Sequence, residues 1–157
     1  MGDLAVIAPV LATRETDLRG LLRGLGESPL ARLPLDTHFA RWVVVPLDGP
    51  RLYFSSRFDG TEERYLDALA RLEEAAAIWS HCETEEDEVL HDPRALRGYL
   101  ARHRVRSPYV LPAWDKVSVA EVNEALDRRA AMSRFAQEAV GLDPVGLAHA
   151  FRERFVR

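Results

Sequence analysis

Cysteine, lysine and long apolar runs are the features that this sequence most clearly lacks. Cys82 is the only cysteine among 157 residues, so the chain can form neither an internal disulfide nor a multi-cysteine metal site. No stretch approaches the roughly 18 uninterrupted apolar residues of a membrane-spanning helix. Lys116 is the only lysine among 21 basic residues, and the net charge of −4 disfavours general binding to nucleic-acid phosphates. We therefore expect no membrane partner and no nucleic-acid partner.

The composition that remains is that of a globular protein, with 47% hydrophobic and 29% charged residues. The length suits one domain with a real core. The first residues, MGDLAV, carry an acid where an export signal needs positive charge, and Val6 stands where a myristoylation signal prefers Ser or Thr. These features predict a cytoplasmic protein.

A β-hairpin is the strongest local prediction. Residues 37–47 (THFARWVVVPL) and 50–58 (PRLYFSSRF) are rich in β-forming residues, and Asp48-Gly49 between them is typical of a tight turn. Regular pairing across this turn puts alternate residues on opposite faces. It predicts a core face with His38, Ala40, Trp42, Val44, Leu52, Phe54, Ser56 and Phe58, and an open face with Phe39, Arg41, Val43, Tyr53, Ser55 and Arg57.

The surrounding pattern predicts an α+β fold. We expect a first strand at 4–11, a helix at 13–26, a second helix at 61–75 capped by Thr61, and a fourth strand at 76–83 (AAIWSHCE). With the hairpin, this order is the ferredoxin-like βαββαβ arrangement around an antiparallel sheet.

Helices are expected to follow this core. Asp92-Pro93 and Asp143-Pro144 are typical helix starts, and Ser118 with Glu121 forms a capping-box pattern. We predict a core at 1–90 and a C-terminal extension of three helices at 91–157, packed on the core as one domain. The apolar connector 104–117 is expected to lie on the surface of that core.

Three motifs together carry a family resemblance: HFARW (38–42), LYFSSRFDG (52–60) and IWSHCE (78–83). They resemble a group of bacterial proteins with the same order of motifs, and the half-repeat architecture is similar to the dimeric α/β-barrel superfamily. That resemblance implies a homodimer whose two sheets enclose a cavity. Members include cofactor-independent oxygenases, polyketide cyclases and haem-dependent enzymes. No match to the peroxidase motifs of the haem members is present, so we predict no cofactor and keep haem as an alternative.

The candidate site residues follow from the open face. Arg41 and Arg57 could clamp a carboxylate or phenolate, with salt bridges as the alternative role, while Tyr53 and Ser55 could donate hydrogen bonds. His81 or His38 could move a proton, unless these histidines are structural. Asp59 is expected to shape its turn and cap the following helix. The histidine spacing indicates no metal site.

Three functions are therefore open. The first is a homodimeric, cofactor-independent oxygenase-like or cyclase-like enzyme that binds an anionic aromatic or lipid-like small molecule. The second is a haem-binding redox protein with an axial histidine. The third is a non-catalytic module whose C-terminal helices expose Phe135, Phe151 and Phe155 to a protein partner if they do not fold back.

Overall fold

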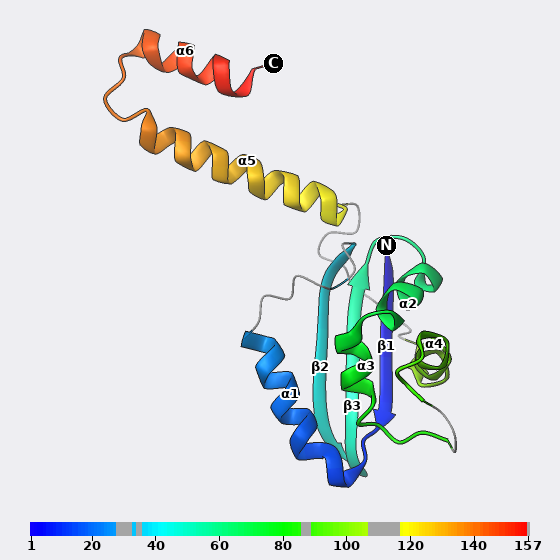
Figure 1. Cartoon of the computed structure of the whole chain (residues 1–157). Helices are drawn as coiled ribbons and strands as arrows, with labels where there is room; N and C mark the ends of the chain where they lie inside the picture. The colour runs from blue at the N-terminus through cyan, green and yellow to red at the C-terminus, as the bar shows by residue number, and fades with distance from the viewer. Residues whose placement is uncertain (28–32, 34–35, 86–88, 107–116, 157) are drawn as a thin grey trace. The chain divides into compact units, whose positions relative to one another are not determined.

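The computed structural model describes residues 1–27, 33, 36–85, 89–106 and 117–156, which form two compact units, Met1–Val119 and Ala120–Arg157. The first unit holds a sheet and its helices (Figure 1). Its elements, in chain order, are β1 (Gly2–Pro9), a 3-10 turn (Ala12–Arg14), α1 (Glu15–Glu27), β2 (Thr37–Leu47), β3 (Gly49–Phe58), α2 (Glu62–Ala70), α3 (Glu73–Trp79), α4 (Pro93–Arg102) and β4 (Arg104–Val105). The first unit thus extends beyond residue 90 and includes α4, which the predicted boundary assigned to the extension.

The sheet is antiparallel, with the strand order β2-β3-β1-β4. The predicted hairpin is confirmed: Leu47 pairs with Gly49, and Gly49 has a φ of 92°, a left-handed conformation that glycine adopts without strain. β1 then pairs with β3 along its whole length, from Gly2 opposite Phe58 to Pro9 opposite Arg51.

The core lies on one face of this sheet, under the helices (Figure 1). Side chains alternate between faces along a strand, so the buried apolar residues of β1 and β3 lie on one face of the sheet. These buried strand residues are Leu4, Val6, Ala8, Leu52, Phe54 and Phe58. Phe54 packs between two indoles, with ring-centroid distances of 4.7 Å to Trp42 and 6.2 Å to Trp79. The aromatic centre therefore joins the hairpin to α3.

The expected strand at 76–83 is wrong, because its first half is helical. α3 ends at Trp79, and the buried side chains of Ala75, Ala76 and Trp79 recur at helical spacing. Among the described residues, one isolated β-bridge, between Cys82 and Val10, joins the following segment to the end of β1. The fourth strand is instead the two-residue β4, which pairs with β1 at Ala5 and Val6. The α+β class with an antiparallel sheet is confirmed, whereas the ferredoxin-like βαββαβ order stays a prediction, because α3 and α4 lie between α2 and the two-residue β4.

A second departure from regular pairing lies at His38. Thr37 pairs with Phe58 and Phe39 with Arg57, so His38 is the extra residue of a β-bulge. A bulge re-aims the side chain of its extra residue. His38 therefore does not share the regular core-face alternation that the sequence predicted, whereas the pairing from Phe39 to Leu47 keeps the predicted division of the other β2 residues between the two faces.

The expected C-terminal helices are present as α4, α5 (Val119–Glu138) and α6 (Pro144–Phe155). Asp92 caps α4 by accepting from the Arg94 amide at 2.7 Å, and Asp143 caps α6 by accepting from the Gly146 amide at 2.7 Å. The prediction for connector 104–117 falls largely on residues 107–116, outside the described part. No helix that the structure describes is long and apolar enough to cross a membrane.

In the second unit, α5 and α6 contact each other through three phenylalanines. The Phe135 ring centroid lies 5.9 Å from that of Phe151 and 5.4 Å from that of Phe155. Phe135 is buried, and Phe151 is 38% exposed. The three phenylalanine rings, which the sequence offered as a surface for a protein partner, thus pack largely on one another.

Candidate functional site

The face of the sheet opposite the core carries the predicted binding residues. Arg41 pairs with Ser55, Val43 with Tyr53 and Phe39 with Arg57, so these six side chains share one face, as predicted. β1 continues it with Asp3, Ala5 and Ile7 opposite Arg57, Ser55 and Tyr53. We call these nine residues, with Arg51, the open face. Phe39 and Val43 are 52% and 36% exposed, so no described part of the first unit covers them fully.

The open face has an excess of positive charge. It carries Arg41, Arg51 and Arg57 against a single carboxylate, Asp3. Among the described residues, no carboxylate forms an ion pair with any of the three arginines. The Arg41 guanidinium lies over the Tyr53 ring, 5.7 Å from its centroid, and Arg57 Nε contacts the weak acceptor Met1 Sδ at 2.8 Å. Both guanidinium groups thus keep donors for an anion.

Ser55, opposite Arg41 in the strand register, provides a further polar group on the open face. Its side chain is only 9% exposed, and among the described residues its buried Oγ has no hydrogen-bond partner. A buried polar atom without a partner costs free energy, so an acceptor supplied from outside would be favoured there. Arg41, Tyr53, Ser55 and Arg57 therefore lie together, and Arg51 was missed although the same alternation would have placed it there.

At one end of the open face, a histidine–aspartate pair tethers the bulge. His38 Nε2 lies 3.0 Å from Asp59 Oδ1, and the other carboxylate oxygen accepts from the Val119 amide at 2.7 Å. Partial burial raises the pKa of Asp59, but the hydrogen bonds from Val119 and His38 and the attraction to His38 outweigh it, so the pKa lies below its usual 3.8. Asp59 does not cap the following helix as expected, because Thr61 Oγ1 accepts from the Arg64 amide at the start of α2, whereas Asp59 accepts from the first residue of α5.

Next to this pair lies a buried hydroxyl network. Ser56 Oγ donates to the Phe39 carbonyl at 2.9 Å and lies 2.5 Å from Tyr65 Oη, so the tyrosine hydroxyl is the donor to Ser56. Burial raises the pKa of Tyr65, and the hydrogen bonds with Ser56 and Thr37 oppose that rise. The Tyr65 ring stacks on Phe58 at 3.9 Å. This network fixes the bulge, and hence the position of His38.

The second predicted proton carrier, His81, lies elsewhere. Its Nδ1 donates to the Ala77 carbonyl at 2.9 Å, and its own carbonyl accepts from Leu11 beyond the carboxyl end of β1. His38 is at the opposite end of the sheet, on the order of 25 Å away along a strand of this length. The structure therefore does not bring the two histidines together. Neighbouring Cys82 is buried, and burial raises the pKa of its thiol to about 12, so it is a poor nucleophile.

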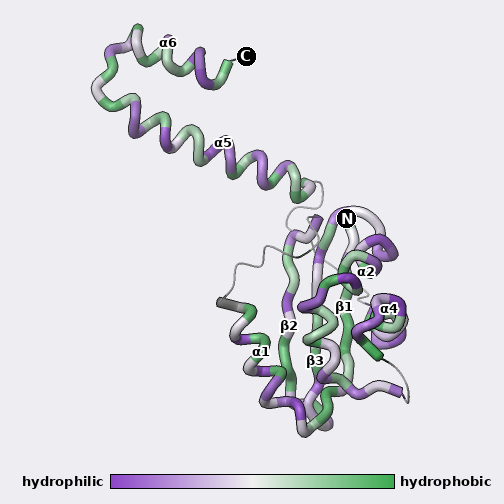
Figure 2. The backbone as a smooth tube through the Cα atoms, in the orientation of Figure 1, coloured by the Kyte–Doolittle hydropathy of each residue, from purple (hydrophilic) through white to green (hydrophobic). Residues whose placement is uncertain are grey.

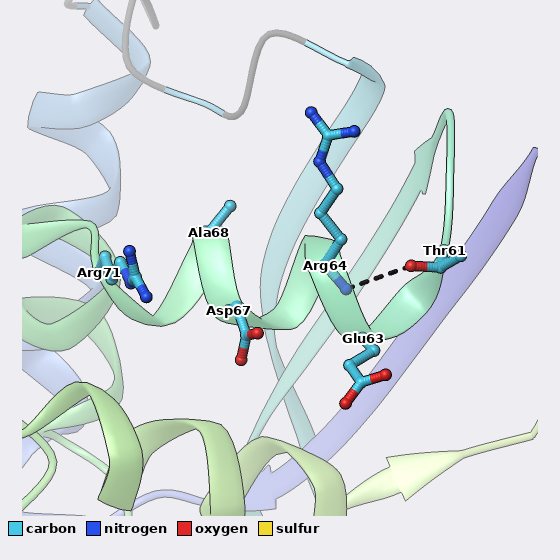
Figure 3. Close-up of a pocket in the computed structure, with 6 residues that line it drawn as sticks. All are labelled: Thr61, Glu63, Arg64, Asp67, Ala68 and Arg71. Atoms are coloured by element: carbon cyan, nitrogen blue, oxygen red, sulfur yellow. Dashed lines mark hydrogen bonds between the residues drawn. The ribbon is translucent and has the colours of Figure 1, made fainter.

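A surface hollow of about 430 Å³ lies on α2 (Figure 3). Its acidic residues, Glu63 and Asp67, both pair with Arg97 of α4, and Arg64 lies 3.6 Å from Asp36. These pairs join α2 to its neighbours. The hollow therefore has less free binding capacity than the open face.

Nothing in the described residues gathers three or more metal-ligating side chains into one cluster. Of the histidines outside the core, His149 lies 3.6 Å from Glu153 on the surface of α6, and His103 donates Nδ1 to the Tyr99 carbonyl. The prediction of a haem-binding protein stays a prediction, and neither His149 nor His103 marks a haem site.

Comparisons with protein-family models, curated proteins and solved structures give no match to this chain. The functional argument consequently depends on the geometry of the open face.

Proposed function

We propose that the open face binds a small aromatic or lipid-like anion, and that the protein does so as a homodimer. The observation that carries the proposal is the presence of three arginines with no carboxylate partner among the described residues, on a face of aromatic and aliphatic side chains. An apolar surface with a few convergent polar groups is the usual composition of a small-molecule site. Arg41 and Arg57 would hold the anionic group, while Tyr53 and Phe39 would contact the apolar body.

Ser55 supports an oxygen-bearing ligand in particular. Its buried Oγ, in register with Arg41, has no described partner and would donate to a ligand oxygen. A purely apolar ligand would leave both this hydroxyl and the arginines unsatisfied. A second copy of the chain would cover the apolar remainder of the face and exclude water from the ligand.

Proton transfer is the chemistry proposed for this site, in keeping with an oxygenase-like or cyclase-like activity without a cofactor. His38 adjoins Phe39 at the end of the open face, and Asp59 holds its Nε2 at 3.0 Å, so Nδ1 is the ring atom left to exchange a proton with a ligand. His81 would not take part, because it lies at the other end of the sheet. Metal-free proton abstraction by a carboxylate-oriented histidine is a common catalytic device.

Binding is tested with anilinonaphthalene sulfonate, an aromatic anion that fluoresces on apolar surfaces, and with naphthoate as its competitor. We expect displacement by naphthoate but not by naphthalene methanol, its neutral counterpart. Arg41→Leu and Arg57→Leu should each weaken binding about tenfold or more, because a charge-assisted hydrogen bond contributes about 1.5–3 kcal/mol. The control is Arg71→Leu, at the exposed C-cap position that follows α2. Equal affinity in all four proteins would refute the arginine site.

Catalysis is tested separately from binding. Oxygen uptake and product formation are measured with a panel of hydroxylated aromatic acids that displace the dye. His38→Gln should leave dye binding unchanged and reduce turnover by at least about a hundredfold, the usual range for loss of a general base. Turnover unaffected by this substitution would leave the ligand site standing and remove His38 from the reaction.

A further inference from the structure

Helix α5 has a long segment on which nothing packs within its own unit. Every residue from Ala120 to Ala130 is exposed, and α6 contacts only the later part of the helix, around Phe135. Isolated helices of this length are marginal in water, and a two-helix unit of fewer than about 40 residues seldom folds without a partner. The segment therefore needs a contact that its own unit does not supply.

The charges of α5 are divided between its two halves. Glu121, Glu124 and Asp127 lie in the first half, and Arg129 and Arg134 lie in the second; Arg128, at the end of the first half, pairs with Glu124 of the same helix. Glu138, the acid at the end, pairs with Arg154 of α6. Two α5 helices packed side by side in opposite directions would thus place acidic residues beside basic ones, whereas packing in the same direction would oppose like charges.

The sizes of the side chains also differ between the two halves of α5. The stripe of α5 nearest to Leu126 carries Val119 and Val122 in the first half, but Ala130 and Ser133 in the second. Val122 and Leu126 are 39% and 53% exposed. Hydrophobic and hydrophilic residues alternate along the helix, so this stripe is narrow (Figure 2). In an antiparallel pair centred near residue 130, the small side chain of Ala130 lies at the crossing point in both helices, and Leu126 of one copy lies near Ser133 of the other, which permits close packing.

We propose that α5 is a self-association surface that pairs with α5 of a second copy in antiparallel orientation. Asp127 and Arg134 are seven residues apart and so lie on one flank of the stripe. About a two-fold axis, Asp127 of each copy faces Arg134 of the other, which gives two equivalent ion pairs. Neither residue forms an ion pair within the described part of the chain. The surface is separate from the open face and does not depend on the ligand proposal.

Charge reversal in the full-length chain tests the pairing. Asp127→Arg and Arg134→Asp should each raise the dissociation constant of the dimer roughly tenfold or more, because each puts like charges together. Mixed in equal amounts, the two variants should form a heterodimer, since the reversed residues then complement each other. The double variant Asp127→Arg/Arg134→Asp should recover self-association. Arg152→Asp, on α6, is the control. Native mass spectrometry measures all of these species.

Cross-linking fixes the orientation and separates this surface from any other dimer contact. A short bismaleimide should link Ala130→Cys to its copy, because position 130 lies near the two-fold axis. It should not link Ala120→Cys, whose two copies would be on the order of 30 Å apart along the pair. Cys82 is buried and does not interfere. Linking at both positions would mean parallel helices. The absence of a cross-link at both positions would also overturn the proposal. That result would mean either a monomer or a dimer held by the open face alone.

Discussion

Removing the carboxylate of Asp59 is the sharpest test of the site geometry. Asp59→Ala loses the hydrogen bonds to His38 and to the Val119 amide. A hydrogen bond to a charged group contributes about 1.5–3 kcal/mol, but the Asp59 side chain is 27% exposed, so water screens part of that value. We expect a loss of about 2 kcal/mol in the free energy of unfolding. Asp59→Asn, which keeps an acceptor for Val119 but no charge, should lose about half as much.

The pH dependence of this loss has a definite sign. The folded state lowers the pKa of Asp59 from its ordinary 3.8, so the carboxylate stabilises the fold above that value. This contribution disappears as the pH falls through the folded-state pKa. The wild-type protein and Asp59→Ala should therefore differ fully near neutral pH and converge in acid below the usual carboxyl range.

Urea unfolding followed by tryptophan fluorescence measures the effect, because Trp42 and Trp79 both contact Phe54 in the core of the first unit. The reasoning would be refuted if Asp59→Ala unfolded at the wild-type urea concentration at neutral pH. It would also be refuted if the difference between the two proteins persisted unchanged in acid.

Three further predictions concern the core, the thiol and a turn. Phe54→Ala should cost about 3–5 kcal/mol in urea unfolding, because the fully buried ring packs between two indoles; a loss below about 1 kcal/mol would contradict that packing. Cys82, buried and with its pKa raised to about 12, should resist iodoacetamide at mildly alkaline pH and react once urea unfolds the chain; equal rates in both states would show an accessible thiol. Gly60→Ala should lower the free energy of unfolding by about 1 kcal/mol, because Gly60 has a φ of 89°. Gly24→Ala should raise it by a few tenths to about 1 kcal/mol, because Gly24 lies on an exposed helix surface with nothing within 4 Å of the added methyl. A shift of the urea midpoint in the same direction for both glycine variants would contradict the argument from backbone conformation.

The hairpin could be predicted from sequence because two local signals agree on it. Asp48-Gly49 favours the turn, and the alternation on both sides of it then determines the register. The open face follows from that register, which is why Arg41, Tyr53, Ser55 and Arg57 were found together. The helix starts at Asp92 and Asp143 were predictable for the same reason, since a cap acts within one turn of the chain.

What could not be predicted depends on contacts distant in sequence. Residues 76–83 form a short apolar run, and such a run does not distinguish a buried helix from a buried strand. Contact with Phe54 and Tyr99 buries Trp79 as part of a helix. β4 consists of two exposed residues, too few for any periodic signal. The bulge at His38 requires one unpaired residue, which the strand sequence does not mark, and the pairing of His38 with Asp59 depends on it.

The two proposed surfaces would have different roles in one assembly. The open faces of two copies, brought together without a ligand, would place uncompensated arginines opposite one another, so their contact alone is unfavourable. An anion bound between them would reduce that repulsion, and ligand binding and closure of the faces would then strengthen each other by linkage. Antiparallel α5 helices would hold the copies at a high effective concentration while the faces remain open to ligand. On this argument, association through α5 would not require ligand, whereas closure of the open faces would.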